Sequence, residues 1–298
     1  MLRLKYSTLL LGLIFIFSCE SKPKISNVPA LTDKITIFEV YLKNPKALDE
    51  FSSFIHDTLR LPVEWNKFDL FGDSVVYDEA FFLGNTTFEL VTLYQGDASM
   101  KEKARYNRII FGVEDVATLS AAIKDDFQHE VPYDFNIVSG NETVSMGKQT
   151  TLDSLSAASN FYVTFWEYLK SGFSFEDRSV KASSMEVLYQ KLGSKLDANP
   201  MGIIALKEVH MSMSNEVVAQ WEKLLGPSIE NQWLLPKGPI LSFQASTATK
   251  GIDWISIQVK NLETAKKHLA TKDLLLDKNG KISISRTEDF GLTVFLEE

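Results

Sequence analysis

Cysteine is almost absent from this chain of 298 residues, whose one copy is Cys19. A single cysteine excludes an internal disulfide and any cluster of thiolate metal ligands. Histidine is also scarce, with four residues, and no His-x-x-x-His, Ser-His-Asp or glycine-rich phosphate-loop pattern occurs. The sequence therefore gives no support to a hydrolase or to a nucleotide-binding protein.

Positive charge is in the minority. The chain carries 31 Lys and Arg against 39 Asp and Glu, a formal net charge of −8, and no long basic run occurs. Nucleic acids and anionic lipid surfaces both attract clustered Lys and Arg, so neither is expected as the main partner. Apolar residues make up 45% of the chain and aromatic residues 11%, which is ample for a packed core.

The N-terminal segment has the three parts of an export signal. Arg3 and Lys5 precede an apolar run over residues 9–17, which ends at Ser18-Cys19. The run is too short to span a bilayer, which needs roughly 20 apolar residues. Charge, a short apolar stretch and a small residue at the boundary are typical of a cleaved signal, so residues 1–18 are predicted to be a signal peptide.

The position of Cys19 favours a lipid anchor. The run Ile16-Phe17-Ser18-Cys19 resembles the lipobox of bacterial lipoproteins, which implies acylation of Cys19 and attachment to a membrane of the bacterial cell envelope. Several acyl chains, each methylene contributing about 0.8 kcal/mol, would anchor the protein stably. Residues 19–33 are then the lipidated cysteine and a flexible, proline-containing tether. The alternative is a signal removed near Cys19 with an incidental cysteine.

An internal repeat organises the rest of the chain. Residues 35–93 alternate as strand, helix and three strands, with Asn44 as N-cap and Pro45 in the first turn of the helix. The pattern starts again near residues 107, 204 and 252, each time with a polar strand-to-helix turn: Glu114-Asp115, Asn215-Glu216 and Asn261-Leu262. Residues 128–159 are irregular, and the third unit is short. An internal repeat of this kind is stronger evidence about the fold than any single local motif.

Three stretches carry a family resemblance: ITIFEVYLKNPKALDEF, RIIFGVEDVATLSAAI and GIIALKEVHMSMSNEVVAQWEKLLG. They resemble the glyoxalase-like, or vicinal oxygen chelate, superfamily. The resemblance implies an α+β fold of tandem βαβββ modules that form two curved-sheet halves. We expect a first module pair over residues 34–170, a helical linker over 171–199 and a second, shorter pair over 200–298.

Enzymes of this family hold a divalent metal ion, which is the only cofactor that the resemblance implies. A His ligand is then expected on the first strand of a module and a Glu ligand on its last strand. The first-strand positions fall on Ile37, Arg108, Glu208 and Trp254, so none is histidine. Glu89 matches the carboxylate of the first unit and is the candidate metal ligand, while Glu167 is a looser match. Carboxylates without imidazole make a poor zinc or iron site, so the usual family metal site is not expected.

Strand alternation predicts which side chains face the concave side of the sheet. In the first strand Phe38, Val40 and Leu42 should pack under the helix. The cavity-facing residues whose side chains could bind a ligand or take part in catalysis are then Glu39, Tyr41, Glu89, Arg108, Tyr162 and Trp166. His129 is a further ligand-binding candidate near the cavity mouth, and His210 is expected on the opposite strand face from Glu208.

This set suggests an aromatic-lined ligand pocket in the first half. Arg108 would grip a carboxylate or phosphate, and Glu39 or Glu89 would act as a general base. Three functions stay open: a small-molecule binding protein without the family metal; a lyase, isomerase or dioxygenase with an atypical metal site; or a protein-interaction module. The structural alternative is a Glu-Arg ion pair inside a filled barrel.

Overall fold

The computed structural model describes residue 32 and residues 34–72, 75–92, 100–139, 142–168 and 185–298. The predicted signal peptide, Cys19 and much of the expected linker lie outside these residues. The first half contains β1 (Ile35–Leu42), α1 (Pro45–Phe54), the π-helical turn η1 (Ile55–Leu59), β2 (Val63–Asp69), β3 (Tyr77–Phe82), β4 (Thr87–Thr92), β5 (Ala104–Gly112), α2 (Val116–Ile123), β6 (Tyr133–Ser139), β7 (Glu142–Thr151), α3 (Asp153–Ser159) and β8 (Tyr162–Tyr168).

The second half begins with a helix that packs against the first. It contains α4 (Met185–Leu196), β9 (Ile203–Met213), α5 (Asn215–Leu225), β10 (Gln232–Leu234), β11 (Ile240–Ala245), β12 (Gly251–Val259), α6 (Leu262–Ala270), β13 (Leu275–Lys278), β14 (Lys281–Ile284), α7 (Ser285–Glu288) and β15 (Val294–Glu297). Within the described part of the chain, no helix has the length and apolar character needed to cross a membrane.

Polar residues start the helices at equivalent places in the repeat. Asn44, Asp115 and Asn261 each accept a hydrogen bond from the backbone N–H three residues later, at 2.9, 2.9 and 2.8 Å. These bonds satisfy N–H groups that the first turn of a helix leaves without partners. In the third unit the cap is Ser214, one residue earlier than the expected Asn215.

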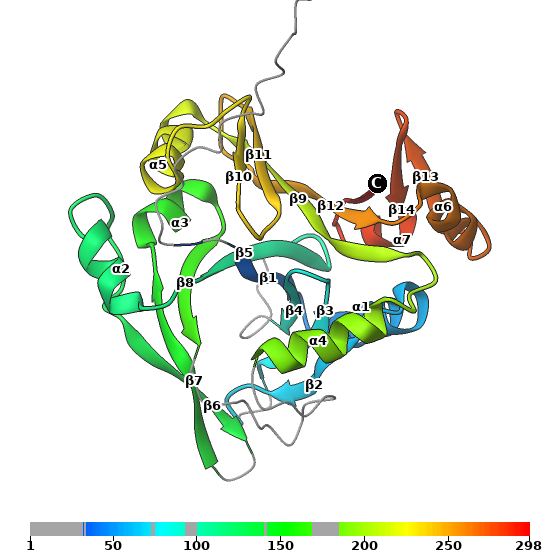
Figure 1. Cartoon of the computed structure of the whole chain (residues 1–298), viewed down its shortest axis with the longest axis horizontal. Coiled ribbons are helices and arrows are strands. Elements are labelled where there is room, and N and C mark those ends of the chain that lie inside the picture. Colours follow the sequence, from blue (N-terminus) through cyan, green and yellow to red (C-terminus); the bar gives the residue numbers. More distant parts are fainter. Residues whose placement is uncertain (1–31, 33, 73–74, 93–99, 140–141, 169–184) are drawn as a thin grey trace, which may run out of the picture.

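Two mixed sheets confirm the predicted α+β fold of paired glyoxalase-like modules (Figure 1). The first sheet has the order β2-β3-β4-β1-β5-β8-β7-β6, and the second β10-β11-β9-β12-β15-β14-β13. In each module the first and last strands pair in parallel, while β1 with β5 and β9 with β12 join two modules antiparallel. The third module lacks one strand, as its short sequence predicts.

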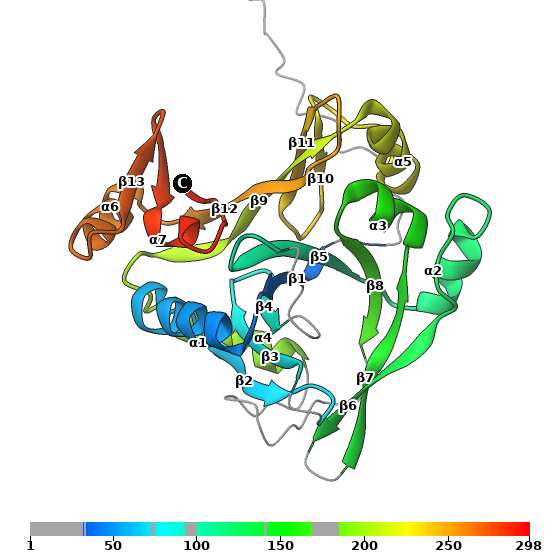
Figure 2. The same cartoon turned by 180° about the vertical axis from the view of Figure 1, so that it is seen from behind.

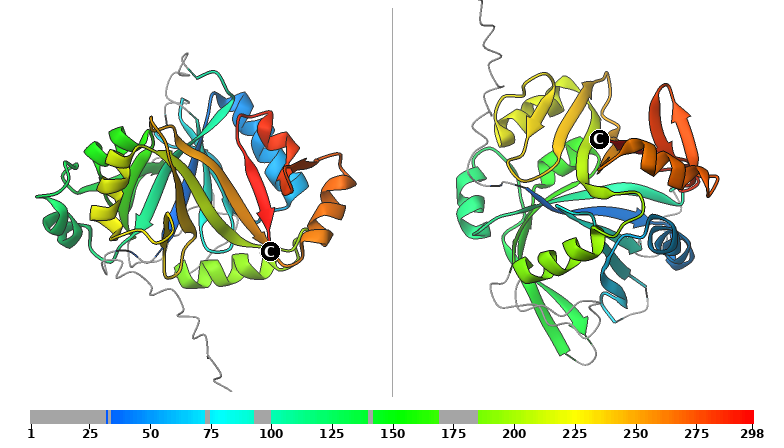
Figure 3. Two further views of the ribbon diagram at one scale, coloured as in Figure 1. Left: turned by 90° about the horizontal axis from the view of Figure 1, so that it is seen from above. Right: turned by 45° about the vertical axis from the view of Figure 1, so that its right-hand side comes forward.

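The two halves share an apolar core. Trp221 of α5 donates its indole N–H to Ser159 Oγ of α3 at 2.9 Å, and these helices lie side by side in Figures 1 and 2. Tyr106 of β5 donates its hydroxyl to the Thr293 carbonyl beside β15. Helix α4 adds buried Leu188 to the same cluster, so the core runs through both sheets. Figure 3 shows the two sheets from two further sides.

The turn between β3 and β4 is fastened to β9. Asn85 accepts a hydrogen bond from the Leu206 N–H at 3.0 Å and donates to the Leu206 carbonyl at 2.9 Å. Gly84 has a φ of +73°, and a Cβ there would lie 1.7 Å from the Ile204 carbonyl oxygen. Glycine is therefore required both by the backbone conformation and by this close approach.

The irregular stretch over residues 128–159 folds as a long hairpin, β6 and β7, followed by helix α3. The sequence pattern did not predict α3. Its sequence, DSLSAAS, is short and carries one large apolar residue, Leu155, so no helical period is visible.

Candidate functional site

Strand register brings three predicted residues together at the centre of the first sheet. Glu39 of β1 is the register partner of Glu89 on the parallel neighbour β4 and of Arg108 on the antiparallel neighbour β5. All three line the same cavity. The alternation argument is therefore correct for β1 and β4, where Phe38, Val40 and Leu42 lie in the main core as expected.

A β-bulge at Asn107 shapes the centre of the site. The pairing of β1 with β5 shifts between Glu39 and Val40, which leaves Asn107 as an extra residue on β5. Because a bulge breaks the two-residue alternation, Asn107 can reach the same carboxylate as its neighbour Arg108. Asn107 Nδ2 donates to Glu39 Oε1 at 2.8 Å, and Arg108 Nη1 lies 3.5 Å from Glu39 Oε2. Glu39 is thus held from two sides.

The concave face of the first sheet encloses a cavity of about 290 Å³. Its lining includes five of the predicted residues: Glu39, Tyr41, Glu89, Arg108 and Trp166. The remaining lining residues come from β3 to β7 and the segment before β3: Leu70, Phe71, Val76, Asp78, Val91, Thr92, Ile110, Tyr133, Phe135 and Gln149. This volume is at the lower end of the range for small-molecule sites.

Asp78 is the main residue that sequence reasoning missed. It lies on β3, is buried, and accepts a hydrogen bond from Trp65 Nε1 at 3.1 Å. Its carboxyl group also hydrogen-bonds to that of Glu89. Alternation within β3 could have found it, since Asp78 and Ala80 share one face and Glu79 points to the other, toward Ser52 and Lys67.

Burial makes the Asp78–Glu89 pair retain a proton. Loss of solvation raises the pKa of Asp78 from 3.8 to about 7, with further contributions from Glu39 and Glu79. Burial, followed by the negative charges of Asp78 and Glu39, raises the pKa of Glu89 well above its usual value. Two adjacent carboxyl groups that share a proton titrate as a unit, and near neutral pH one of them is an acid and the other a base.

Arg108 Nε and Gln149 Oε1 are buried polar atoms of this cavity that have no hydrogen-bond partner within the described residues. Gln149 is only 4% exposed, and its amide nitrogen donates to the Tyr133 hydroxyl. Leaving a buried donor or acceptor unsatisfied costs about 1–3 kcal/mol. A ligand that offers one acceptor and one donor would recover this energy, so these atoms mark where it would bind.

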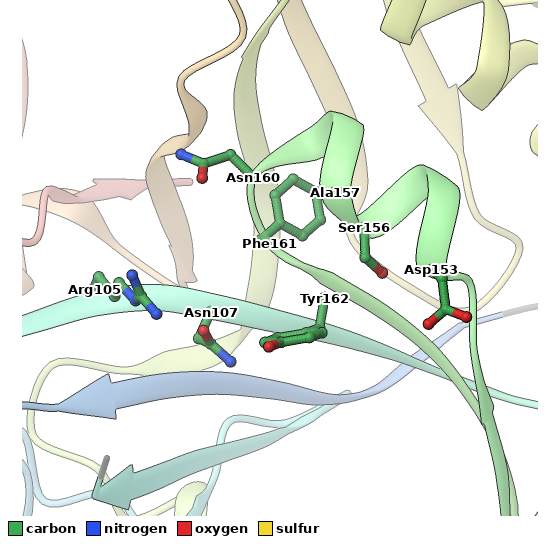
Figure 4. Close-up of a pocket in the computed structure, with 8 residues that line it drawn as sticks. All are labelled: Arg105, Asn107, Asp153, Ser156, Ala157, Asn160, Phe161 and Tyr162. Carbon is green, nitrogen blue, oxygen red and sulfur yellow. The ribbon is translucent and has the colours of Figure 1, made fainter. Parts of the chain in front are cut away.

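Tyr162 lines a second cavity and is not among the residues that line the first. Its ring is 5.1 Å from the Arg108 guanidinium, and the residue is 44% exposed. The second cavity, of about 330 Å³, is also lined by Arg105, Asn107 and residues of α3 and the turn that follows: Asp153, Ser156, Ala157, Asn160 and Phe161 (Figure 4). Asn107 and Tyr162 thus connect this polar cavity with the Glu39–Arg108 pair of the first.

His129 lies outside both cavities. One ring nitrogen, Nε2, is 2.6 Å from Ser120 Oγ, and Nδ1 is 3.0 Å from the Phe127 carbonyl oxygen. A carbonyl oxygen only accepts, so Nδ1 donates to it, and in the neutral ring Nε2 accepts from the serine. These contacts hold His129 against the end of the segment that follows α2, and its predicted ligand-binding role stays a prediction.

In the second sheet, Glu208 and His210 lie on the same face of β9, so the expectation of opposite faces was wrong. Residues two apart in a strand share a face. His210 Nδ1 is 2.7 Å from Ser242 Oγ, which also donates to Glu208, and the imidazole stacks on Trp254 at 4.5 Å. Burial lowers the pKa of His210. These polar groups satisfy one another.

The side chains that could act as metal ligands in this cavity do not suit the divalent metal ion that the family resemblance implies. Among the described residues, no group of three or more His, Cys, Asp and Glu side chains is arranged to hold a metal ion. Glu89 instead hydrogen-bonds to a second carboxyl group, and no imidazole is among the residues that line the cavity. The metal role of Glu89 therefore stays a prediction.

No protein-family model and no curated protein matches the sequence. Solved structures do match over most of the chain. A variant of 4-hydroxymandelate synthase from Streptomyces coelicolor aligns with a TM-score of 0.58 at 10% identity, covering 89% of this chain and 92% of that one. A hypothetical protein from Staphylococcus aureus aligns with a TM-score of 0.56 at 12% identity, covering 89% and 98%.

A third match is the 2,3-dioxygenase LapB from Pseudomonas sp. KL28, with a TM-score of 0.53 at 12% identity, covering 90% of this chain and 93% of the other. At such identities the likeness concerns the fold alone. The matches therefore support the fold, two halves of paired glyoxalase-like modules.

Proposed function

We propose that this chain is a lipoprotein of the bacterial cell envelope that binds a small organic molecule in the concave cavity of its first sheet. Arg108 Nε and Gln149 Oε1, buried in that cavity without partners among the described residues, carry the proposal. Natural folds rarely leave such groups unsatisfied unless a ligand or water completes them. The ligand would be held by Arg108, Gln149 and the aromatic side chains of Tyr41 and Trp166, without the family metal.

A thermal-shift screen of the purified protein against a metabolite library tests ligand binding. Gln149→Leu removes the free acceptor at nearly constant size, and Gln128→Leu, on the exposed segment before β6, is the matched control. Hits should stabilise the wild type and the control but not the Gln149 variant. Absence of any hit, or hits of equal strength in all three proteins, would argue against this cavity as the ligand site.

The anchor is tested separately. In a bacterial host, the protein should incorporate radiolabelled palmitate and sediment with membranes, and Cys19→Ser should abolish both. Unchanged membrane association of the variant would leave a binding protein without a lipid anchor.

The Asp78–Glu89 pair favours a second candidate, an enzyme of the isomerase or lyase type. A protonated carboxyl next to an ionised one can supply a proton and accept one beside a bound molecule. The version with an atypical metal site is tested by elemental analysis of protein purified without chelator or nickel resin, in the wild type and in Glu89→Gln. A stoichiometric transition metal in the wild type, lost in the variant, would put this candidate first.

A further inference from the structure

The charges around the concave cavity do not balance. Three carboxyl groups line it, from Glu39, Asp78 and Glu89, against the single guanidinium of Arg108 among the described lining residues. Glu39 is already matched, by Arg108 at 3.5 Å and by Asn107 at 2.8 Å. Within the described part of the chain the Asp78–Glu89 pair has no cation of its own, and the two carboxyl groups contact each other. Buried charges in proteins ordinarily lie next to an opposite charge, and within the described residues the Asp78–Glu89 pair has no such counterion.

The rest of the lining also suits a cation. Five aromatic side chains surround the cavity: Tyr41, Phe71, Tyr133, Phe135 and Trp166. Aromatic faces attract ammonium groups. Gln149 on β7, only 4% exposed, presents a carbonyl oxygen that accepts no hydrogen bond from the described residues. An acceptor without a donor is independent evidence for a ligand that donates.

We propose that the ligand of this cavity is a small organic molecule with a protonated amine, held by the carboxyl groups of Asp78 and Glu89 with Gln149 Oε1 as a further acceptor. An ammonium group has three donors and no acceptor, which matches this set. The positive charge replaces the proton that the two carboxyl groups share, and that proton passes to the solvent. This inference rests on the proposed function, because it concerns the ligand of the same site.

Matched probes of equal shape and different charge test the proposal. Isothermal titration calorimetry on the full chain compares 2-phenylethylamine with 2-phenylethanol and phenylacetate, in two buffers of different ionisation enthalpy. The amine should bind at least about tenfold more tightly than the alcohol at pH 8, because hydrogen bonds between charged groups are the stronger ones. Its binding should release up to one proton, and its affinity should rise about tenfold from pH 6 to pH 8 as Asp78 ionises, since burial raises the pKa of this carboxyl group to about 7.

Two variants of the β3–β4 hairpin test whether Glu89 is responsible for the preference for the amine. Glu89→Gln should reduce the preference for the amine to about twofold or less, whereas Glu79→Gln, a carboxylate on β3 that points away from the cavity, should keep it. An alcohol or phenylacetate that binds as tightly as the amine would overturn the proposal while leaving a ligand site in place. If no library compound of any charge binds, the proposed function itself fails.

Discussion

Replacing Asp78 with asparagine is expected to flatten the pH dependence of the protein's stability. Asp78 is 4% exposed, accepts a hydrogen bond from Trp65 and faces the carboxyl groups of Glu89 and Glu39. Burial, the largest cause, and the neighbouring negative charges raise its pKa from 3.8 to about 7. The folded protein therefore binds a proton at pH 5 that the unfolded chain releases.

The sign and size of the effect follow from linkage. A carboxyl group with a raised folded-state pKa gives its full stabilisation below about pH 3.8, and that stabilisation is lost as the pH rises to about 7. One pKa unit corresponds to about 1.4 kcal/mol, so the loss between pH 5 and pH 8 is about 3 kcal/mol. Asparagine does not titrate, so the Asp78→Asn variant should not show this loss of stability.

Urea unfolding at pH 5 and pH 8, followed by far-UV circular dichroism, measures the difference. The free energy of unfolding of the wild type should fall by about 3 kcal/mol more than that of Asp78→Asn over this interval. Asp125→Asn, the same change at an exposed turn after α2, should behave like the wild type. Equal slopes for the wild type and Asp78→Asn would refute the reasoning, because Asp78 would then titrate alike in the folded and unfolded states.

Three further substitutions test the packing around the site, each by urea unfolding at pH 7. Gly84→Ala should cost at least about 3 kcal/mol, because the new Cβ meets the Ile204 carbonyl and the residue has a positive φ; a loss below about 1 kcal/mol would show that this turn is not in tight contact. Asn107→Ala should cost about 1–3 kcal/mol by removing a donor to Glu39, and no loss would show that solvent replaces it. Trp221→Phe should cost about 1–3 kcal/mol in a single transition, and two separate transitions would contradict a shared core.

The repeat, the fold class and the faces of β1, β4 and β8 could be predicted from the sequence. In β1 the large apolar side chains fall on every second residue, so one face is assigned to the core and the other to the cavity. In β8 the same argument correctly separates Val163 and Phe165 from Trp166. Alternation of this kind is a local property, and sequence alone reveals it.

The remainder of the site depends on non-local pairing. The bulge that turns Asn107 toward Glu39 arises from the register between β1 and β5, which no single strand encodes. Gln149, Tyr133 and Phe135 lie on a hairpin whose polar residues hide its period. That this hairpin lines the cavity becomes apparent only from the assembled sheet.

The fastening of the β3–β4 turn to β9 has a practical consequence for dissecting this protein. The hairpin that carries Asp78 and Glu89 is held at its tip by the Leu206 backbone, which belongs to the other sheet. A fragment that ends before residue 200 would release that tip and expose the apolar surface that contacts Trp221. The proposed ligand site lies in one half of the chain, but the smallest unit expected to keep it intact is both halves together.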